Sequence, residues 1–133
     1  MAELLFEACR KSDGKTIQSL VDNAPQILNA MEDECNKSTA LHWAVQNANF
    51  KVLLCLLENV NQHQIDAKNR FGQTALHLAE KLYLTTHAQY LRTFGAAVNA
   101  TDNEGNTPLH YIVLFRERGF YSLIMICYTD CHL

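Results

Sequence analysis

Residues 39–44 read Thr-Ala-Leu-His-Trp-Ala, and close copies of this stretch occur twice more along the chain. Residues 74–79 read Thr-Ala-Leu-His-Leu-Ala, and residues 107–112 read Thr-Pro-Leu-His-Tyr-Ile. The threonines that open the three copies are 35 and 33 residues apart. Self-similarity at a fixed period of about 20–50 residues indicates an array of stacked repeats rather than one closed core.

Each position of the repeated stretch has a physical reason. The opening threonine stands where a helix is expected to begin, and its hydroxyl can cap free backbone N–H groups. Pro108 follows one threonine at the first helical position, where its missing N–H costs nothing. The leucine and the small alanine are expected between stacked units, and the histidine can bridge backbone groups of neighbouring turns. Gly72 and Gly105 suit turns that need a positive φ.

The pattern resembles the ankyrin repeat, whose T-P-L-H-x-A signature recurs about every 33 residues. Residues 3–21 fit a degenerate first unit, with Leu5 and Ala8 at signature positions. The resemblance implies an all-α ankyrin-repeat solenoid of helix-turn-helix units joined by β-hairpin-like fingers. It predicts a single domain over residues 1–133, with units of approximately 1–33, 34–67, 68–100 and 101–133.

Helical apolar spacing predicts a second helix in every unit. In the first unit Ile17, Leu20 and Val21 belong to it. The later ones are expected at about 50–59, 85–94 and 119–127. The residues expected to point inward are Val52, Leu53, Leu56 and Leu57 in the second unit, and Ala88, Leu91 and Phe94 in the third.

Four places depart from the repeat pattern. Lys37 stands where a finger glycine normally sits, so the first finger is expected to be less regular. Residues 59–66 carry about two extra residues and should form a bulging loop. Tyr83-Leu84 replaces the usual Gly-His, which predicts a bulkier, more apolar turn between the helices. Ile112 replaces the small alanine and predicts looser packing in the last unit.

The C-terminal stretch 120–128 is apolar almost all round, whereas a terminal repeat should show a polar outer face. Three explanations are open. The chain is a piece of a longer array, or its end is covered by a partner or a second copy, or the last helix is poorly capped. The second explanation allows self-association through this C-terminal helix.

Composition excludes several classes of function. The net charge is −3 with scattered basic residues, so no nucleic-acid partner is expected. The sequence contains no run of about 18 apolar residues, so no membrane span is expected. Five cysteines without a signal peptide favour free thiols in a reducing compartment. The expected location is therefore cytoplasmic or nuclear, or the cytosol of a host cell into which the protein is delivered.

Neither an enzyme nor a metal or cofactor site is expected. Zinc sites need two close pairs of ligands, and Cys127, Cys131 and His132 form the one close group. The signature histidines recur with their threonines three times, as structural residues do and an active site does not. No Gly-rich phosphate loop or nucleophile elbow occurs.

The resemblance places partner binding on the concave side, formed by the fingers and the first helices of the units. The variable residue after the signature histidine is Trp43, Leu78 or Tyr111, and Gln46 lies on the same helix as Trp43. Aromatic residues are favoured interface anchors, but these three equally suit packing between first helices. The finger-tip candidates either bind a partner or pack on the adjacent finger. They are Glu34, Cys35, Asn36, Asn69, Arg70, Phe71, Asn103 and Glu104.

Asn99 resembles the ankyrin asparagine that a cytosolic oxygen-dependent hydroxylase modifies. The alternative is that its side chain stabilises its own turn. The leading functional hypothesis is a non-catalytic protein–protein interaction module. The alternatives are a regulatory inhibitor or pathogen effector that mimics the inhibitor of NF-κB, and a substrate-adaptor segment of a larger ubiquitin ligase or scaffold protein.

Overall fold

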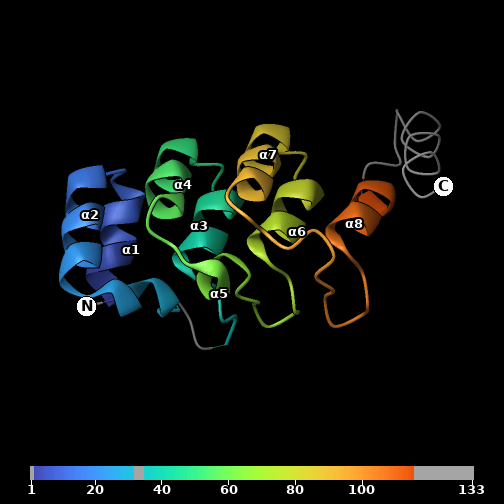
Figure 1. Ribbon diagram of the computed structural model, residues 1–133, viewed down its shortest axis with the longest axis horizontal. Coiled ribbons are helices and arrows are strands. Elements are labelled where there is room, and N and C mark those ends of the chain that lie inside the picture. Colours follow the sequence, from blue (N-terminus) through green and yellow to red (C-terminus); the bar gives the residue numbers. More distant parts are fainter. Residues whose placement is uncertain (1, 32–34, 116–133) are drawn as a thin grey trace.

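The computed structural model describes residues 2–31 and 35–115, with the backbone alone at Phe115. Within these ranges the regular elements are helices, and no strand forms (Figure 1). They are α1 (Ala2–Arg10), α2 (Gly14–Asn23), the 3-10 helix η1 (Pro25–Asn29), α3 (Ala40–Gln46), α4 (Phe50–Leu57), α5 (Gln62–Ile65), α6 (Ala75–Lys81), α7 (Thr85–Thr93) and α8 (Pro108–Phe115).

The helices form two rows that run along the long axis of the molecule (Figure 1). In the inner row α1, α3, α6 and α8 contact one another in that order, and in the outer row α2, α4 and α7 do the same. The buried side chains lie between the rows as one continuous cluster. This arrangement confirms the predicted helical solenoid, because each helix pair hides its apolar faces against its neighbours.

Two hairpin-like loops project from the inner row (Figure 1). We call residues 66–74 finger 3 and residues 100–107 finger 4. In finger 3 the Asn69 N–H donates to the Gln73 carbonyl at 2.9 Å, and in finger 4 the Asp102 N–H donates to the Asn106 carbonyl at 2.9 Å. The predicted fingers therefore close as hairpins, although they are too short to form a ladder.

The signature histidines tie successive units together. His42 Nδ1 accepts from the Thr39 N–H at 3.2 Å, so its other nitrogen carries the proton and donates to the Gln73 carbonyl at 2.8 Å. His77 repeats the arrangement one unit later and reaches the Asn106 carbonyl at 2.8 Å. Each histidine thus fixes the start of its own helix and holds the following finger, as the sequence predicts.

The position two residues before the signature threonine has a positive φ in all three units. The angle is +56° at Lys37, +78° at Gly72 and +83° at Gly105. Lys37 therefore adopts the conformation that glycine has in the other two units. A positive φ costs free energy in a residue with a side chain. The same position requires a positive φ in all three units, and in the second unit a strained lysine adopts it.

The turns between the paired helices show a similar strain. Ser12, Ala48 and Tyr83 each have φ between +52° and +62°. Tyr83 replaces the usual glycine, and its side chain is 51% exposed. Leu84 is partly buried and packs against the core. The bulky apolar turn predicted at Tyr83-Leu84 is therefore present.

Two local predictions are wrong. Residues 59–66 do not form a simple loop, because Asn61 caps the short helix α5 by accepting from the Gln64 N–H at 2.9 Å. The Gln64 side chain accepts from the Asn61 N–H in return, also at 2.9 Å. Phe94 does not point inward: α7 ends at Thr93, and the Phe94 side chain is 41% exposed.

The other inward positions named for the second and third units are buried, as are Leu5, Ala8, Ile17 and Val21. Ile112 is partly exposed in the last described helix. The helix expected at 119–127 and the apolar stretch 120–128 lie outside the described residues. Among the helices that are described, none has the length and apolar character needed to cross a bilayer.

Candidate functional site

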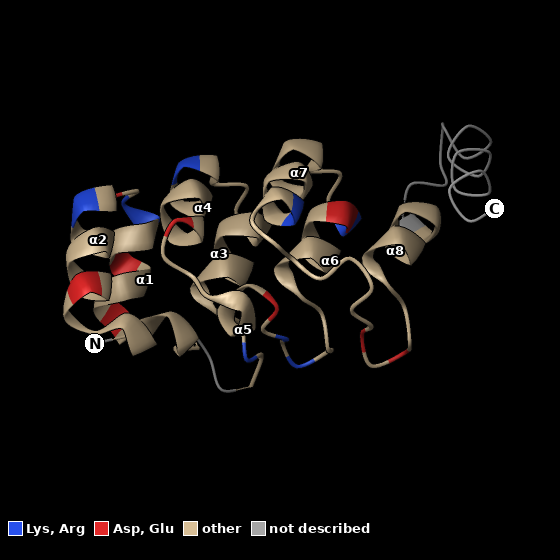
Figure 2. Ribbon diagram, viewed as in Figure 1, with Lys and Arg blue, Asp and Glu red and all other residues tan. Residues whose placement is uncertain are grey.

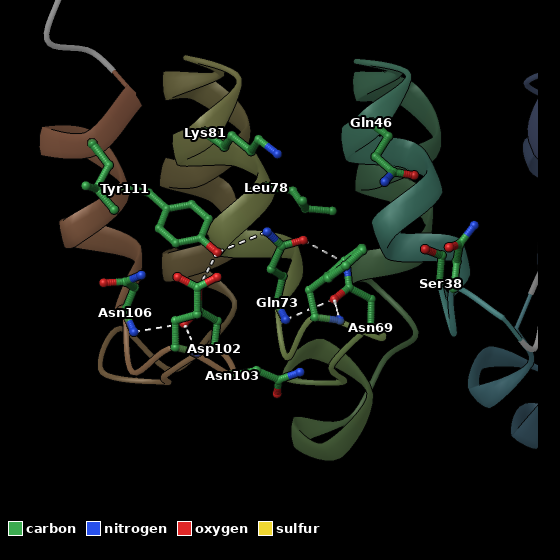
Figure 3. Close-up of a pocket in the computed structure, with 14 residues that line it drawn as sticks. Ser38, Gln46, Asn69, Gln73, Leu78, Lys81, Asp102, Asn103, Asn106 and Tyr111 are labelled. Carbon is green, nitrogen blue, oxygen red and sulfur yellow. Dashed lines mark hydrogen bonds between the residues drawn. The ribbon is translucent and has the colours of Figure 1, made fainter.

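A groove of about 540 Å³ lies between the two fingers and the inner-row helices α3, α6 and α8 (Figure 3). Most of the residues that the sequence nominated for partner binding line it. They are Asn36, Gln46, Asn69, Phe71, Leu78, Asn103, Glu104 and Tyr111. They meet there because the repeat period returns equivalent positions to the same face of the stack. Glu34 lies outside the described residues.

The three residues that follow the signature histidines are mostly buried. Trp43 is 9% exposed, Leu78 is 4% exposed and Tyr111 is 3% exposed. This is the burial expected of side chains that pack between first helices. Leu78 and Tyr111 also contribute to the groove wall, whereas Trp43 does not line it. Contact of these residues with a partner stays a prediction.

A chain of polar side chains crosses the floor of the groove (Figure 3). The Tyr111 hydroxyl on α8 donates to an Asp102 carboxylate oxygen, and the Gln73 side-chain amide donates to the same hydroxyl at 3.0 Å. The Asn69 amide donates to the Gln73 side-chain carbonyl at 3.0 Å. Finger 3, finger 4 and α8 are thereby joined through side chains.

Gln73 and Asp102 were not singled out from the sequence, although a signal was present. Asn69 and Asp102 occupy the same position, five residues before the signature threonine. The Oδ1 atom of each accepts the backbone N–H groups of the residues two and four places later, at 2.9–3.0 Å. This turn is one that Asn and Asp side chains build with their own backbone.

The electrostatics of the groove are set by finger 4. Burial, together with the hydrogen bond to Asp102, raises the pKa of Tyr111 to about 12, so the phenol stays protonated. Burial opposes ionisation of Asp102, but hydrogen bonds from Tyr111, Asn106 and Glu104 outweigh it and lower the pKa of the Asp102 carboxyl. Asp102 is therefore a carboxylate at neutral pH.

One backbone and one side-chain hydrogen bond hold the finger tips together. The Asn103 N–H donates to the Phe71 carbonyl at 3.0 Å, and the Asn103 side-chain amide donates to the Arg70 carbonyl at 3.0 Å. The Phe71 ring nevertheless stays 54% exposed. The Arg70 guanidinium lies 5.4 Å from the centre of that ring and outside the groove lining. Hydrogen bonds thus hold the backbone of the finger tips, while Phe71 stays open to solvent.

Asn99 lies in a turn with its side chain exposed. It makes no side-chain hydrogen bond to any residue that the structure describes, so the alternative role in holding its turn gains no support. Its hydroxylation stays a prediction. No group of three His, Cys, Asp or Glu side chains comes together among residues 2–31 and 35–115. Cys127, Cys131 and His132 lie outside these ranges.

Comparison with known proteins agrees with this architecture. The family model described as ankyrin repeats (3 copies) matches residues 56–132, and that described as ankyrin repeats (many copies) matches residues 5–57. Human rabankyrin-5 is 34% identical in an alignment of 105 residues that covers 71% of this chain. Rat diacylglycerol kinase zeta is 31% identical over 106 residues, which is 80% of this chain.

Mouse ankyrin repeat domain-containing protein 53 is 36% identical in an alignment of 76 residues that covers 54% of this chain. The matched segments span 9% of the length of rabankyrin-5, 11% of diacylglycerol kinase zeta and 15% of the mouse protein. The similarity therefore concerns the repeat architecture and not the whole of these larger proteins. Together with the repeated signature and the stacked helix pairs, the matches show that the chain belongs to the ankyrin-repeat family.

Proposed function

We propose that this chain is a non-catalytic binding domain that holds a segment of a partner protein in the groove between its fingers and its inner-row helices. Ankyrin repeats are in general protein–protein interaction modules, and their fold is non-catalytic. The observation that carries the proposal is the groove itself, where the exposed aromatic side chain of Phe71 lies beside polar side chains fixed by hydrogen bonds.

The composition of the groove suits a protein surface. Phe71 and Leu114 are 54% and 50% exposed, so a partner that covers them removes apolar area from water. The Asn69–Gln73–Tyr111–Asp102 chain fixes the polar floor before binding. A rigid floor of this kind lowers the ordering cost of association. The finger-to-finger hydrogen bonds rigidify the rim in the same way.

The narrower hypotheses from the sequence remain predictions. An inhibitor or effector of the NF-κB-inhibitor type and a substrate adaptor would both use this groove. They differ in the partner that fills it. Cytoplasmic or nuclear residence, or delivery into a host cytosol, likewise belongs to the proposal.

Site-specific photocross-linking tests the proposal. Phe71 is replaced by p-benzoylphenylalanine, which preserves an aromatic ring at the groove wall, and the full chain is irradiated in cell lysate. We expect a discrete protein adduct whose cross-linked peptide can be identified by mass spectrometry. Soluble unlabelled chain should compete for the same adduct, because the binding surface is saturable.

The matched control carries the same photoreactive residue at Phe94. This aromatic is also partly exposed, at 41%, but it follows α7 in the outer row. Equal adducts at the two positions, or a groove adduct that excess unlabelled chain does not remove, would contradict binding through the groove.

A further inference from the structure

The two fingers carry opposite net charge (Figure 2). Finger 3 bears Lys68 and Arg70 with a single carboxylate, Asp66, whereas finger 4 bears Asp102 and Glu104 and no basic residue. Of the residues that line the groove, the ionised ones are Lys81 on α6 and the two carboxylates of finger 4. The groove therefore has a negative end at finger 4, next to α8.

The two carboxylates lack a cationic partner within the described residues. The Asp102 carboxylate accepts two backbone N–H groups and the Tyr111 hydroxyl, so part of its acceptor capacity remains. Glu104 is exposed beside it and acts electrostatically on the same Tyr111 phenol. Both negative charges thus act on one wall of the groove, where they attract a cation.

An extended segment matches the remaining polar groups. The side-chain amides of Gln46 and Asn106 line the groove and form no hydrogen bond with described residues. Each amide offers both a donor and an acceptor. A peptide in extended conformation presents free backbone N–H and C=O groups to such amides, whereas a helix satisfies its own. The half-exposed Phe71 ring adds an apolar contact along the same path.

We propose that the occupant of the groove is an extended peptide segment that carries a Lys or Arg side chain, which pairs with Asp102 and Glu104 at the finger 4 end. This rests on the proposed function, because it names the chemistry of the partner that the groove binds. The charge complementarity gives specificity and a salt-dependent association rate in addition to affinity.

Selection from a phage-displayed library of random peptides tests the proposal, with the full wild-type chain as bait. We expect the enriched peptides to contain Lys or Arg more often than the unselected library. Synthetic copies labelled with fluorescein are then titrated with the chain, and their anisotropy gives Kd. Raising the salt concentration should weaken this binding, since part of it is electrostatic.

The decisive variant is Asp102→Asn combined with Glu104→Gln. The chain itself shows that Asn supports the finger turn, because Asn69 accepts the same two N–H bonds in finger 3. Removing both charges should raise Kd about tenfold. Glu104→Gln alone alters an exposed side chain and should give a smaller increase in Kd, which keeps the test available if Asp102→Asn lowers stability.

Two controls separate charge from fold and from groove occupancy. Asp22→Asn combined with Glu58→Gln removes the same charge from exposed carboxylates outside the groove, and Kd should stay at the wild-type value. Phe71→Ala removes the exposed aromatic ring from the groove, and Kd should rise for any peptide that lies in the groove.

The outcomes distinguish this inference from the proposed function. Peptides that lose binding with Phe71→Ala yet carry no basic residue, or bind the double carboxylate variant as tightly as wild type, overturn the inference and leave groove binding in place. Peptides that bind every variant as tightly as wild type overturn both. A library that yields no enriched peptide also overturns the inference, because the committed occupant is a short extended segment.

Discussion

Replacing Gly72 by Ala tests how much the contact between fingers stabilises the fold. The φ of Gly72 is +78°, which costs an L-residue about 1–2 kcal/mol. A methyl group there would also lie 2.5 Å from the Asn103 side-chain oxygen and 2.6 Å from its backbone nitrogen. Finger 4 would have to move, and the two Asn103 hydrogen bonds to finger 3 contribute about 0.5–1.5 kcal/mol each. The expected loss is therefore about 2–5 kcal/mol.

Gly105→Ala is the matched control for this variant. Its φ is +83°, but no described atom lies within 4 Å of the added methyl group. It should therefore lose the conformational part alone, about 1–2 kcal/mol. The difference between the two variants isolates the contact between the fingers.

Urea unfolding of both variants measures the two losses. The single tryptophan, Trp43, is buried and reports unfolding through its fluorescence. We expect the midpoint of Gly72→Ala to fall clearly below that of Gly105→Ala with similar slopes. If the two glycine variants lose the same free energy of unfolding, the close approach of Asn103 to finger 3 does not stabilise the protein and the reasoning is refuted.

Four further outcomes follow. Lys37→Gly should raise the free energy of unfolding by up to about 1 kcal/mol, because it relieves a positive φ at +56°; a lower urea midpoint would contradict this. Leu76→Ala should lose about 2–5 kcal/mol by emptying core space, and a loss below 1 kcal/mol in urea unfolding would rule out close packing there. Tyr111→Phe should lose about 1 kcal/mol by deleting the hydroxyl of the groove floor, measured in the same way against wild type. Burial lowers the pKa of His42 and of His77 below the usual 6.5, so the unfolded chain binds more protons than the folded one below that pH. The free energy of unfolding should therefore fall as the pH drops below 6.5, by at most about 1.4 kcal/mol per pH unit for each histidine. Urea midpoints that match at pH 7.5 and pH 5.5 would contradict this.

The fold could be predicted from the sequence because the repeat period fixes the register of every unit at once. Once the threonine at 39, 74 or 107 marks a helix start, the buried leucine and the bridging histidine follow from geometry. The short helix α5 was missed, although Asn61 and Gln64 have the spacing of a capping pair. Helical spacing predicts that Phe94 points inward, but the helix ends one residue earlier and Phe94 is 41% exposed.

The site could be predicted in position but not in its interactions. The period brings the finger and first-helix candidates to one groove, yet the depth of each side chain depends on how neighbouring units pack. Tyr111 was nominated as an anchor, and the structure shows a buried ring with its hydroxyl in the groove floor. Its partners, Gln73 and Asp102, lie 38 and 9 residues away in the chain, and no local pattern joins them.

Amide hydrogen exchange of the full chain, with and without a peptide selected by it, tests whether a partner binds in the groove, since it reads every segment in one experiment. Binding in the groove predicts slower exchange in finger 3 (66–74), finger 4 (100–107) and the inner-row helix α6, with little change in the outer-row helices α2, α4 and α7. Protection confined to the outer row would show that the partner binds the opposite side of the stack, and the groove would not be the binding site.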